Sequence, residues 1–120
     1  MKIAIASTER NLEANVSSIF GRGSAFIFAN VDKEKVENID IIENTAKNKS
    51  GAGNVAAQLL IDHGVNVLIS GKLGPVAFHI LKNAGIRVYK AGPGSVKDNL
   101  KRFNEDRLEE IKSLSGGFPA

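Results

Sequence analysis

The sequence has no cysteine and no tryptophan, only three prolines, and no long apolar run. Without cysteine, neither a disulfide framework nor a thiolate metal site can form. No segment approaches the ~20 apolar residues that a membrane-spanning helix needs. The segment 1–6 is too short, and is followed too soon by polar residues, for a signal peptide. We therefore expect a cytoplasmic protein without a membrane partner.

A strongly basic surface is also lacking, although the net charge is +3. Residues 61–120 hold nine basic and six acidic side chains, whereas residues 1–60 hold seven of each. Nucleic-acid binding usually requires a denser basic stripe with interleaved aromatic residues. Most phenylalanines here lie inside apolar runs, as is typical of a core. Nucleic acid is therefore not an expected partner.

The 120 residues suit one domain, which we place at residues 1–113, with 114–120 as a flexible tail. Residues 2–6 predict a strand buried on both faces, and further strands are predicted over 24–31, 65–69 and 86–90. Residues 36–43 alternate apolar and polar side chains, which predicts a half-exposed edge strand. Helices are predicted over 54–63, from Pro75 onward, and after the N-cap Ser95; residues 105–113 extend this last helix or form another.

This order of elements predicts an α/β fold with a five-stranded mixed sheet and helices on its faces. The first three strands form an antiparallel meander, and the last two follow by right-handed parallel crossovers. The expected strand order is 3-2-1-4-5, with strand 2 antiparallel to strand 1. Four connections then meet at one edge of the sheet, which we call the loop edge: residues 7–23, 44–53, 70–74 and 91–95.

The loop edge contains the marked glycine motifs of the sequence, and three of its connections lead into helix N-termini. Backbone N–H groups and helix N-termini favour anions, and glycine allows close approach to a ligand. The predicted ligand-binding residues are Ser7, Phe20, Gly21, Arg22, Gly23, Ser50, Gly51, Gly53, Gly71, Lys72, Gly74, Gly92, Gly94 and Ser95. Arg22 and Lys72 add positive charge. Alternatively, the glycines are only turns and caps, Arg22 bridges to Glu9 or Glu13, and Lys72 is a solvated loop charge.

Three segments carry a resemblance to a known family: Phe20-Gly21-Arg22, Ser50-Gly51-Ala52-Gly53 and the run from Ser70 to Pro75. With the Gly-Ile-Arg-Val-Tyr run at 85–89, they resemble the dinitrogenase iron–molybdenum cofactor biosynthesis family over about residues 1–103. That family includes nitrogenase accessory proteins that carry cofactor or iron–sulfur precursors. The resemblance implies a ribonuclease-H-like fold and an iron–sulfur or iron–molybdenum cluster as cargo. A cofactor-assembly protein is the implied partner.

The histidines do not form an evident metal site. Several members of the family carry a histidine just before the Phe-Gly pair, where this chain has Ile19. His63 is expected at the end of the helix over 54–63, near its dipole, and His79 is expected to face solvent. The two do not have a metal-ligand spacing such as i, i+4. No residue of this chain is therefore predicted to bind a metal directly.

The carboxylates do not support an enzyme. A nuclease of this fold needs clustered carboxylates for two metal ions, and strands 2–6, 65–69 and 86–90 carry none. Glu9, Glu13 and Glu43 lie near the loop edge without an identifiable partner. We therefore expect a non-enzymatic carrier of an anionic iron–sulfur or iron–molybdenum cofactor or its precursor. The alternatives are a metal-independent binder of a small anionic (phosphorylated) metabolite, or a protein-interaction module that uses the edge strand 36–43.

Overall fold

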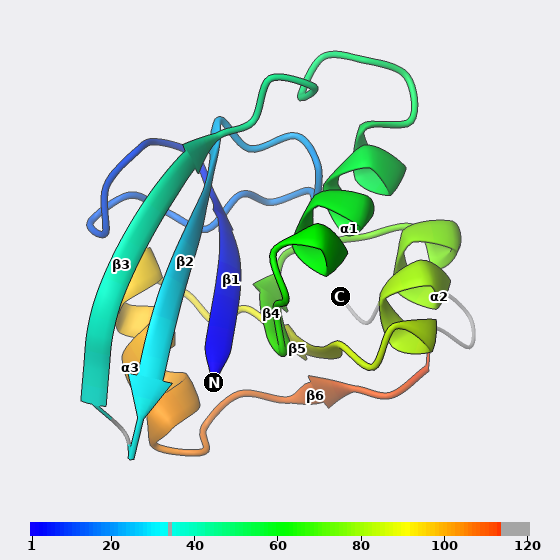
Figure 1. Ribbon diagram of the computed structural model, residues 1–120. Coiled ribbons are helices and arrows are strands. Elements are labelled where there is room, and N and C mark those ends of the chain that lie inside the picture. Colours follow the sequence, from blue (N-terminus) through cyan, green and yellow to red (C-terminus); the bar gives the residue numbers. More distant parts are fainter. Residues whose placement is uncertain (34, 114–120) are drawn as a thin grey trace.

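A computed structural model of the chain describes residues 1–33 and 35–113 (Figure 1). The elements follow in the order β1 (Lys2–Ser7), β2 (Ala25–Asp32), β3 (Lys35–Glu43), α1 (Ala52–Asp62), β4 (Val67–Ser70), α2 (Pro75–Asn83), β5 (Arg87–Lys90), α3 (Val96–Asn104) and β6 (Glu110–Ile111). Within these ranges, no helix is long and apolar enough to cross a membrane. The predicted tail 114–120 lies outside the described residues.

The strands form one mixed sheet in the order β3-β2-β1-β4-β5-β6. β2 pairs antiparallel with both β1 and β3, whereas β1, β4 and β5 are mutually parallel. These pairings confirm the predicted α/β fold, the order 3-2-1-4-5 and the antiparallel second strand. β6 adds one strand beyond the five that were predicted.

The predicted helix over residues 105–113 is wrong. α3 ends at Asn104, and Asp106 turns the chain with a φ of 58°. β6 then pairs antiparallel with β5, with Ile111 opposite Val88. Ile111 is only 3% exposed, because it lies beside β5 and packs into the first core with residues of α2. This burial, which the local sequence does not reveal, favours a strand over a continued helix.

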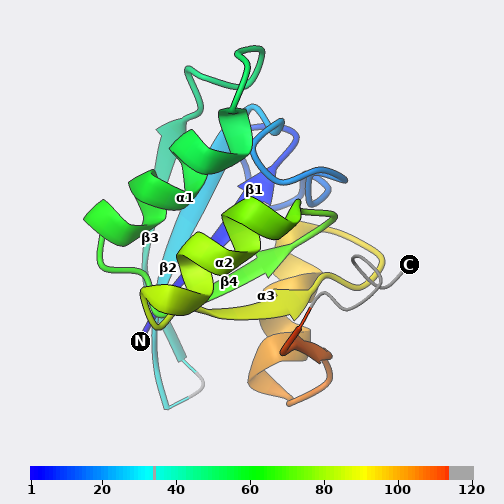
Figure 2. The same cartoon turned by 90° about the vertical axis from the view of Figure 1, so that its right-hand side faces the viewer.

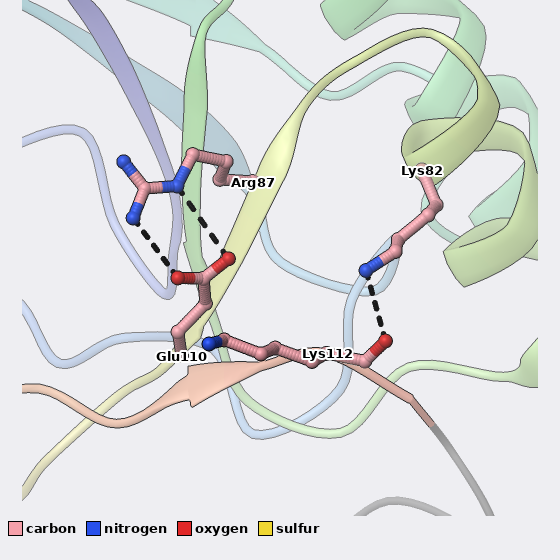
Figure 3. Close-up of polar contacts among 4 residues, drawn as sticks. All are labelled: Lys82, Arg87, Glu110 and Lys112. Atoms are coloured by element: carbon pink, nitrogen blue, oxygen red, sulfur yellow. Dashed lines mark hydrogen bonds and ion pairs between the residues drawn. The ribbon is translucent and has the colours of Figure 1, made fainter.

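Polar contacts also hold this final segment against the rest of the fold (Figure 3). The Arg87 guanidinium donates to both carboxylate oxygens of Glu110, at 2.9 and 3.5 Å. The Lys82 ammonium donates to the Lys112 carbonyl oxygen at 2.9 Å. β6 is therefore fixed to β5 and to the end of α2 at once.

Two cores lie on opposite faces of the sheet, because successive strand residues point to opposite sides. Ala4 and Ala6 of β1 contribute to the first core, with the buried residues of α1 and α2. Ile3 and Ile5 contribute to the second core, with Val96 and Leu100 of α3. Figure 2 shows α1 and α2 on one side of the sheet and α3 on the other.

β3 is the outer strand of the sheet, and its side chains are exposed or half-buried along its whole length. This confirms the prediction of a half-exposed edge strand. The register shifts between Asn30 and Val31, so that Val31 pairs with Val36 and Asn30 with Asn38. This irregularity turns Val36 to the side of the second core.

The topology places the ends of β1, β4 and β5 at the same edge of the sheet as the end of β3. The connections that follow these strands therefore lie together at the loop edge. In Figure 1 the loops after β1 and β3 and the N-terminus of α1 are all at the upper end of the molecule. α1 starts at Ala52, two residues before the predicted start.

Candidate functional site

Two connections of the loop edge are bonded directly to each other. The Phe20 N–H donates to the Lys72 carbonyl oxygen at 2.6 Å, and the Lys72 N–H donates to the Ser18 carbonyl oxygen at 2.8 Å. Gly71 lies where the two connections cross. A Cβ there would lie 2.5 Å from the carbonyl oxygens of Ser17 and Ser18, so only glycine fits. Gly71 thus joins the segments 17–20 and 70–74.

Other predicted ligand-binding residues form the buried support of the same region. A Cβ at Gly21, where φ is 91°, would lie 2.8 Å from the Gly53 Cα. A Cβ at Gly23 would lie 2.7 Å from the Ser7 carbonyl oxygen. Ser7 is fully buried and donates its hydroxyl to the Glu9 carbonyl oxygen at 2.6 Å, and Phe20 belongs to the first core. Direct ligand contact by these residues stays a prediction.

Arg22 fixes the connection between β3 and α1. Its guanidinium donates to the carbonyl oxygens of Lys47, at 2.8 Å, and Lys49, at 3.2 Å. The alternative of a bridge to Glu9 or Glu13 is wrong, because Arg22 forms no ion pair with either carboxylate in the described part of the chain and its Nη1 donates to backbone carbonyl oxygens instead. Arg22 acts on the loop edge by holding the segment that leads to Ser50 and Gly51.

Sequence reasoning missed Asn44, which supports this connection from the inside. Its buried amide donates to the carbonyl oxygens of Gly21, at 2.9 Å, and Gly23, at 3.0 Å. The Asn44 side-chain oxygen accepts the Ala46 N–H at 3.2 Å. An asparagine after a strand is common in turns, so the sequence offered no specific signal for this role.

The N-termini of α1 and α2 lie side by side and have no side-chain caps. Gly51, with φ of 73°, precedes α1, and Gly74 precedes α2. The two helix ends are close, because a Cβ on Gly53 would lie 3.8 Å from that of Ala77. No described residue accepts a hydrogen bond from the first-turn N–H groups of Ala52, Gly53, Val76 and Ala77. Around Gly51 and Gly74 the space for a Cβ is open to 4 Å.

The N-terminus of α3 is different, because its donors are already used. Ser95 and Asp98 form a capping box, each side chain accepting the other residue's N–H at 3.0 Å. These hydrogen bonds hold the pKa of Asp98 below its usual value. The Val96 and Lys97 N–H groups donate to carbonyl oxygens of residues 14 and 12 at 2.8 and 2.9 Å. This helix end therefore offers a ligand little hydrogen bonding.

The connection 91–95 is held by a second asparagine that sequence reasoning missed. Asn99 is fully buried; its side-chain oxygen accepts the Gly92 N–H at 2.8 Å and its amide donates to the Gly92 carbonyl oxygen at 3.1 Å. Gly94 has a φ of 103°, which favours glycine. A pocket of about 350 Å³ separates this connection from segment 15–18 and Gly71. Of the predicted residues, Gly71, Gly92 and Gly94 line this pocket.

Residues 1–106 match the family model described as dinitrogenase iron-molybdenum cofactor. The chain belongs to this family. Membership confirms the resemblance seen in the glycine motifs and ties the chain to metal-cofactor handling.

Individual proteins are similar to this chain over almost its whole length. An uncharacterised protein of Methanocaldococcus jannaschii is 36% identical over 113 residues, which is 93% of this chain and 92% of that protein. The apo form of the orange protein from Desulfovibrio gigas has a TM-score of 0.82, with 30% identity and 93% coverage of both chains. A NifB-like protein of Thermotoga has a TM-score of 0.81, with 34% identity, and covers 95% of this chain and 96% of its own.

The family position occupied by Ile19 lies at the surface of the loop edge. Ile19 is 49% exposed and forms a parallel bridge with Lys72. Lys72 is itself exposed, and its ammonium has no hydrogen bond or ion pair to any residue that the structure describes. A side chain at position 19 therefore lies at the surface of the loop edge, next to the Lys72 backbone.

The two histidines of the chain lie on or next to helices. His63 follows α1; its Nδ1 is 2.9 Å from the Leu59 carbonyl oxygen, and its ring stacks on Phe28 at 5.2 Å. His79 is exposed on α2, as expected. Over residues 1–33 and 35–113, no three histidine, aspartate or glutamate side chains gather closely enough to hold a metal ion.

Proposed function

We propose that the chain is a cytoplasmic, non-enzymatic carrier of an anionic iron–sulfur or iron–molybdenum cluster, or a precursor of one. The observation that carries this proposal is the pair of uncapped helix N-termini at the loop edge. Most helices begin with a residue whose side chain accepts a first-turn N–H. Here Gly51 and Gly74 leave those donors unpaired at two neighbouring helix ends.

The chemistry of these helix ends suits a compact anion. Two helix N-termini each present partial positive charge and backbone donors. Sulfide and oxygen atoms of an anionic cluster accept such hydrogen bonds, and glycine leaves room for them to approach. Lys72, on the connection that leads to α2, adds a full charge. Since the chain has no cysteine, the cargo is held by charge and hydrogen bonds or by ligands that it brings with it.

The polar groups near the loop edge fit a carrier protein better than an enzyme. The Ser7 hydroxyl donates to a backbone carbonyl oxygen rather than to a side-chain base, and Glu43 is paired with Arg10. A nucleophile would need a base within hydrogen-bond reach. The relatives also fit this view, since one of them is known in an apo form and the family is named for a cofactor. A cofactor-assembly protein is the partner to which we expect the cargo to pass.

The test uses two glycines that the fold tolerates losing. A Cβ at Gly53 makes only ordinary contacts, the nearest at 3.8 Å, and a Cβ at Gly74 meets nothing within 4 Å. Gly53→Ala and Gly74→Ala should leave the melting temperature unchanged or raised. Each methyl should nevertheless weaken binding of tetrathiomolybdate by about tenfold, since hydrogen bonds to charged groups contribute about 1.5–3 kcal/mol each.

Calorimetric titration should include tetrathiomolybdate alone, tetrathiomolybdate with ferrous iron, and inorganic phosphate. Tighter binding of the metal sulfide than of phosphate supports a cluster carrier. Preference for phosphate would favour the alternative of a phosphorylated metabolite at the same helix ends. Unchanged affinity in both alanine variants would overturn the placement of the site.

A further inference from the structure

A groove of about 440 Å³ lies on the α3 side of the sheet, apart from the helix ends of the proposed cluster site. It runs between α3 and the edge strand β3, since residues of both elements line it. In Figure 1 α3 lies behind β2 and β3. The lining residues are Leu12, Val36, Ile39, Lys97, Leu100, Lys101, Asn104 and Glu105. None of them is among the predicted ligand-binding residues, so the groove needs its own explanation.

The floor of the groove is an uncovered margin of the second core. Leu12 and Ile39 pack against that core but are only half-buried. Val36 is 38% exposed and pairs with Val31, a residue of the second core. The register shift at Asn30/Val31 therefore adds an apolar side chain to a surface that no described element covers.

One wall of the groove is positively charged. Lys97 and Lys101 are four residues apart on α3, so their side chains lie on the same face of the helix. Neither ammonium forms an ion pair in the described part of the chain. The acidic residue at this wall, Glu105, is paired with Arg107 at 3.3 Å. Two cations thus border an apolar floor. The neighbouring Asp98 carboxylate attracts Lys101, but it accepts the Ser95 N–H and forms no ion pair with either lysine in the described part of the chain.

The groove is also held in shape before any ligand binds. The Lys97 N–H donates to the Leu12 carbonyl oxygen at 2.9 Å, which fixes the segment before β2 against α3. Leu100 is almost fully buried and anchors α3 in the second core. A preformed apolar groove with a few convergent polar groups, of a volume between about 300 and 1,000 Å³, is typical of small-molecule sites.

We propose that this groove binds an amphiphilic anion, such as a carboxylate or sulfonate attached to an extended apolar body. Lys97 and Lys101 bind the anionic head, and Leu12, Val36 and Ile39 bind the apolar body. An inorganic anion would gain nothing from this floor, and a neutral hydrocarbon would gain nothing from the two lysines. The charge and the apolar surface together therefore select an amphiphile.

Dodecanoate, kept below its micelle concentration, is the probe, and dodecanol is its uncharged counterpart. Lys97→Gln and Lys101→Gln remove the charges singly, and Val36→Thr keeps the shape of the side chain while adding a hydroxyl. The controls are Lys112→Gln, which removes an exposed lysine elsewhere, and Val55→Thr, which changes an exposed valine of α1. Titration is followed by backbone amide shifts, which also locate the site.

Dodecanoate should bind one per chain, shift amides of β3 and α3, and bind several-fold more tightly than dodecanol. Each lysine variant should weaken binding by about two- to fivefold, the range for an exposed ion pair. Val36→Thr should also weaken it, and both controls should match the wild type. Equal affinity of Lys101→Gln and Lys112→Gln, or shifts confined to the loop edge, would overturn the proposal. So would the absence of amphiphile binding alongside binding of an extended peptide to the edge of β3.

Discussion

Two glycines three residues apart, Gly71 and Gly74, differ completely in what surrounds them. Gly71→Ala should destabilise the fold by about 1–3 kcal/mol or more, since the added methyl meets two carbonyl oxygens at 2.5 Å. Gly74→Ala should cost almost nothing, because its methyl meets no atom within 4 Å. Chemical denaturation of both variants measures the difference. Similar midpoints for the two would contradict the crossing of segments 17–20 and 70–74 that the structure describes.

A substitution at Ile19 should increase ligand affinity rather than reduce it. It is exposed beside Lys72, at the position where several members of the family carry a histidine. Ile19→His should increase affinity for an iron-containing thiomolybdate by about tenfold, because neutral imidazole is a good iron ligand. Affinity for thiomolybdate without iron should change little. Val36→His, at an exposed apolar position near the start of β3 and thus at the opposite end of that strand from the loop edge, is the control, and an equal gain there would contradict the prediction.

At the scale of elements, β6 depends on an ion pair that titrates. The hydrogen bond from Arg87 holds the pKa of Glu110 below its usual value of 4.5, and Glu110 raises the pKa of Arg87. Because the pKa of Glu110 is lower in the folded state, its contribution to stability is present above the unfolded-state pKa. That contribution is lost as the pH falls through the folded-state pKa.

Glu110→Gln should therefore lower the melting temperature modestly at neutral pH, and the difference from wild type should shrink below about pH 4.5. Thermal melts at a series of pH values measure this. Asp98 titrates in the same direction in both proteins, so it cancels in the comparison. A difference that grows toward acid pH would show that Arg87 and Glu110 do not stabilise β6 through their charges.

The elements also show what the sequence could predict. β1 to β5 and the three helices follow from apolar patterns and from caps such as Ser95, which are local signals. β6 has only two paired residues, and its stability comes from the burial of Ile111 and the partner Arg87, which are tertiary contacts. The role of Asn44 was missed for the same reason, since its partners Gly21 and Gly23 are distant in sequence. The role of Asn99 depends instead on how the connection 91–95 folds back onto α3.

At the scale of the whole molecule, the glycines expected to bind one ligand divide into two kinds. Gly21, Gly23 and Gly71 lie where segments press against each other, whereas Gly51 and Gly74 lie at open helix ends. Sequence places all of them at the loop edge because the strand order does so. The sequence cannot tell which of these glycines are packed between segments and which lie at open helix ends, because that depends on which segments cross at the loop edge. The sites available to a ligand are therefore fewer than the glycine motifs suggested.

This division predicts that folding and binding can be impaired separately. Ile111 is buried in the first core at the β6 margin of the sheet, apart from the helix ends at Gly51 and Gly74. Ile111→Ala should cost about 2–5 kcal/mol in the free energy of unfolding, toward the lower value because the short β6 segment can readjust. Its affinity for tetrathiomolybdate should match the wild type at a temperature where both are folded.

Gly74→Ala should show the opposite pattern, with unchanged stability and weakened binding. Denaturation and titration give the stability and the affinity of each variant. The two predictions stand only if Ile111→Ala loses stability alone and Gly74→Ala loses affinity alone. Loss of binding in Ile111→Ala while the protein remains folded would mean that β6 and the loop edge are coupled through the sheet. The helix ends could then not be treated as a site independent of the core.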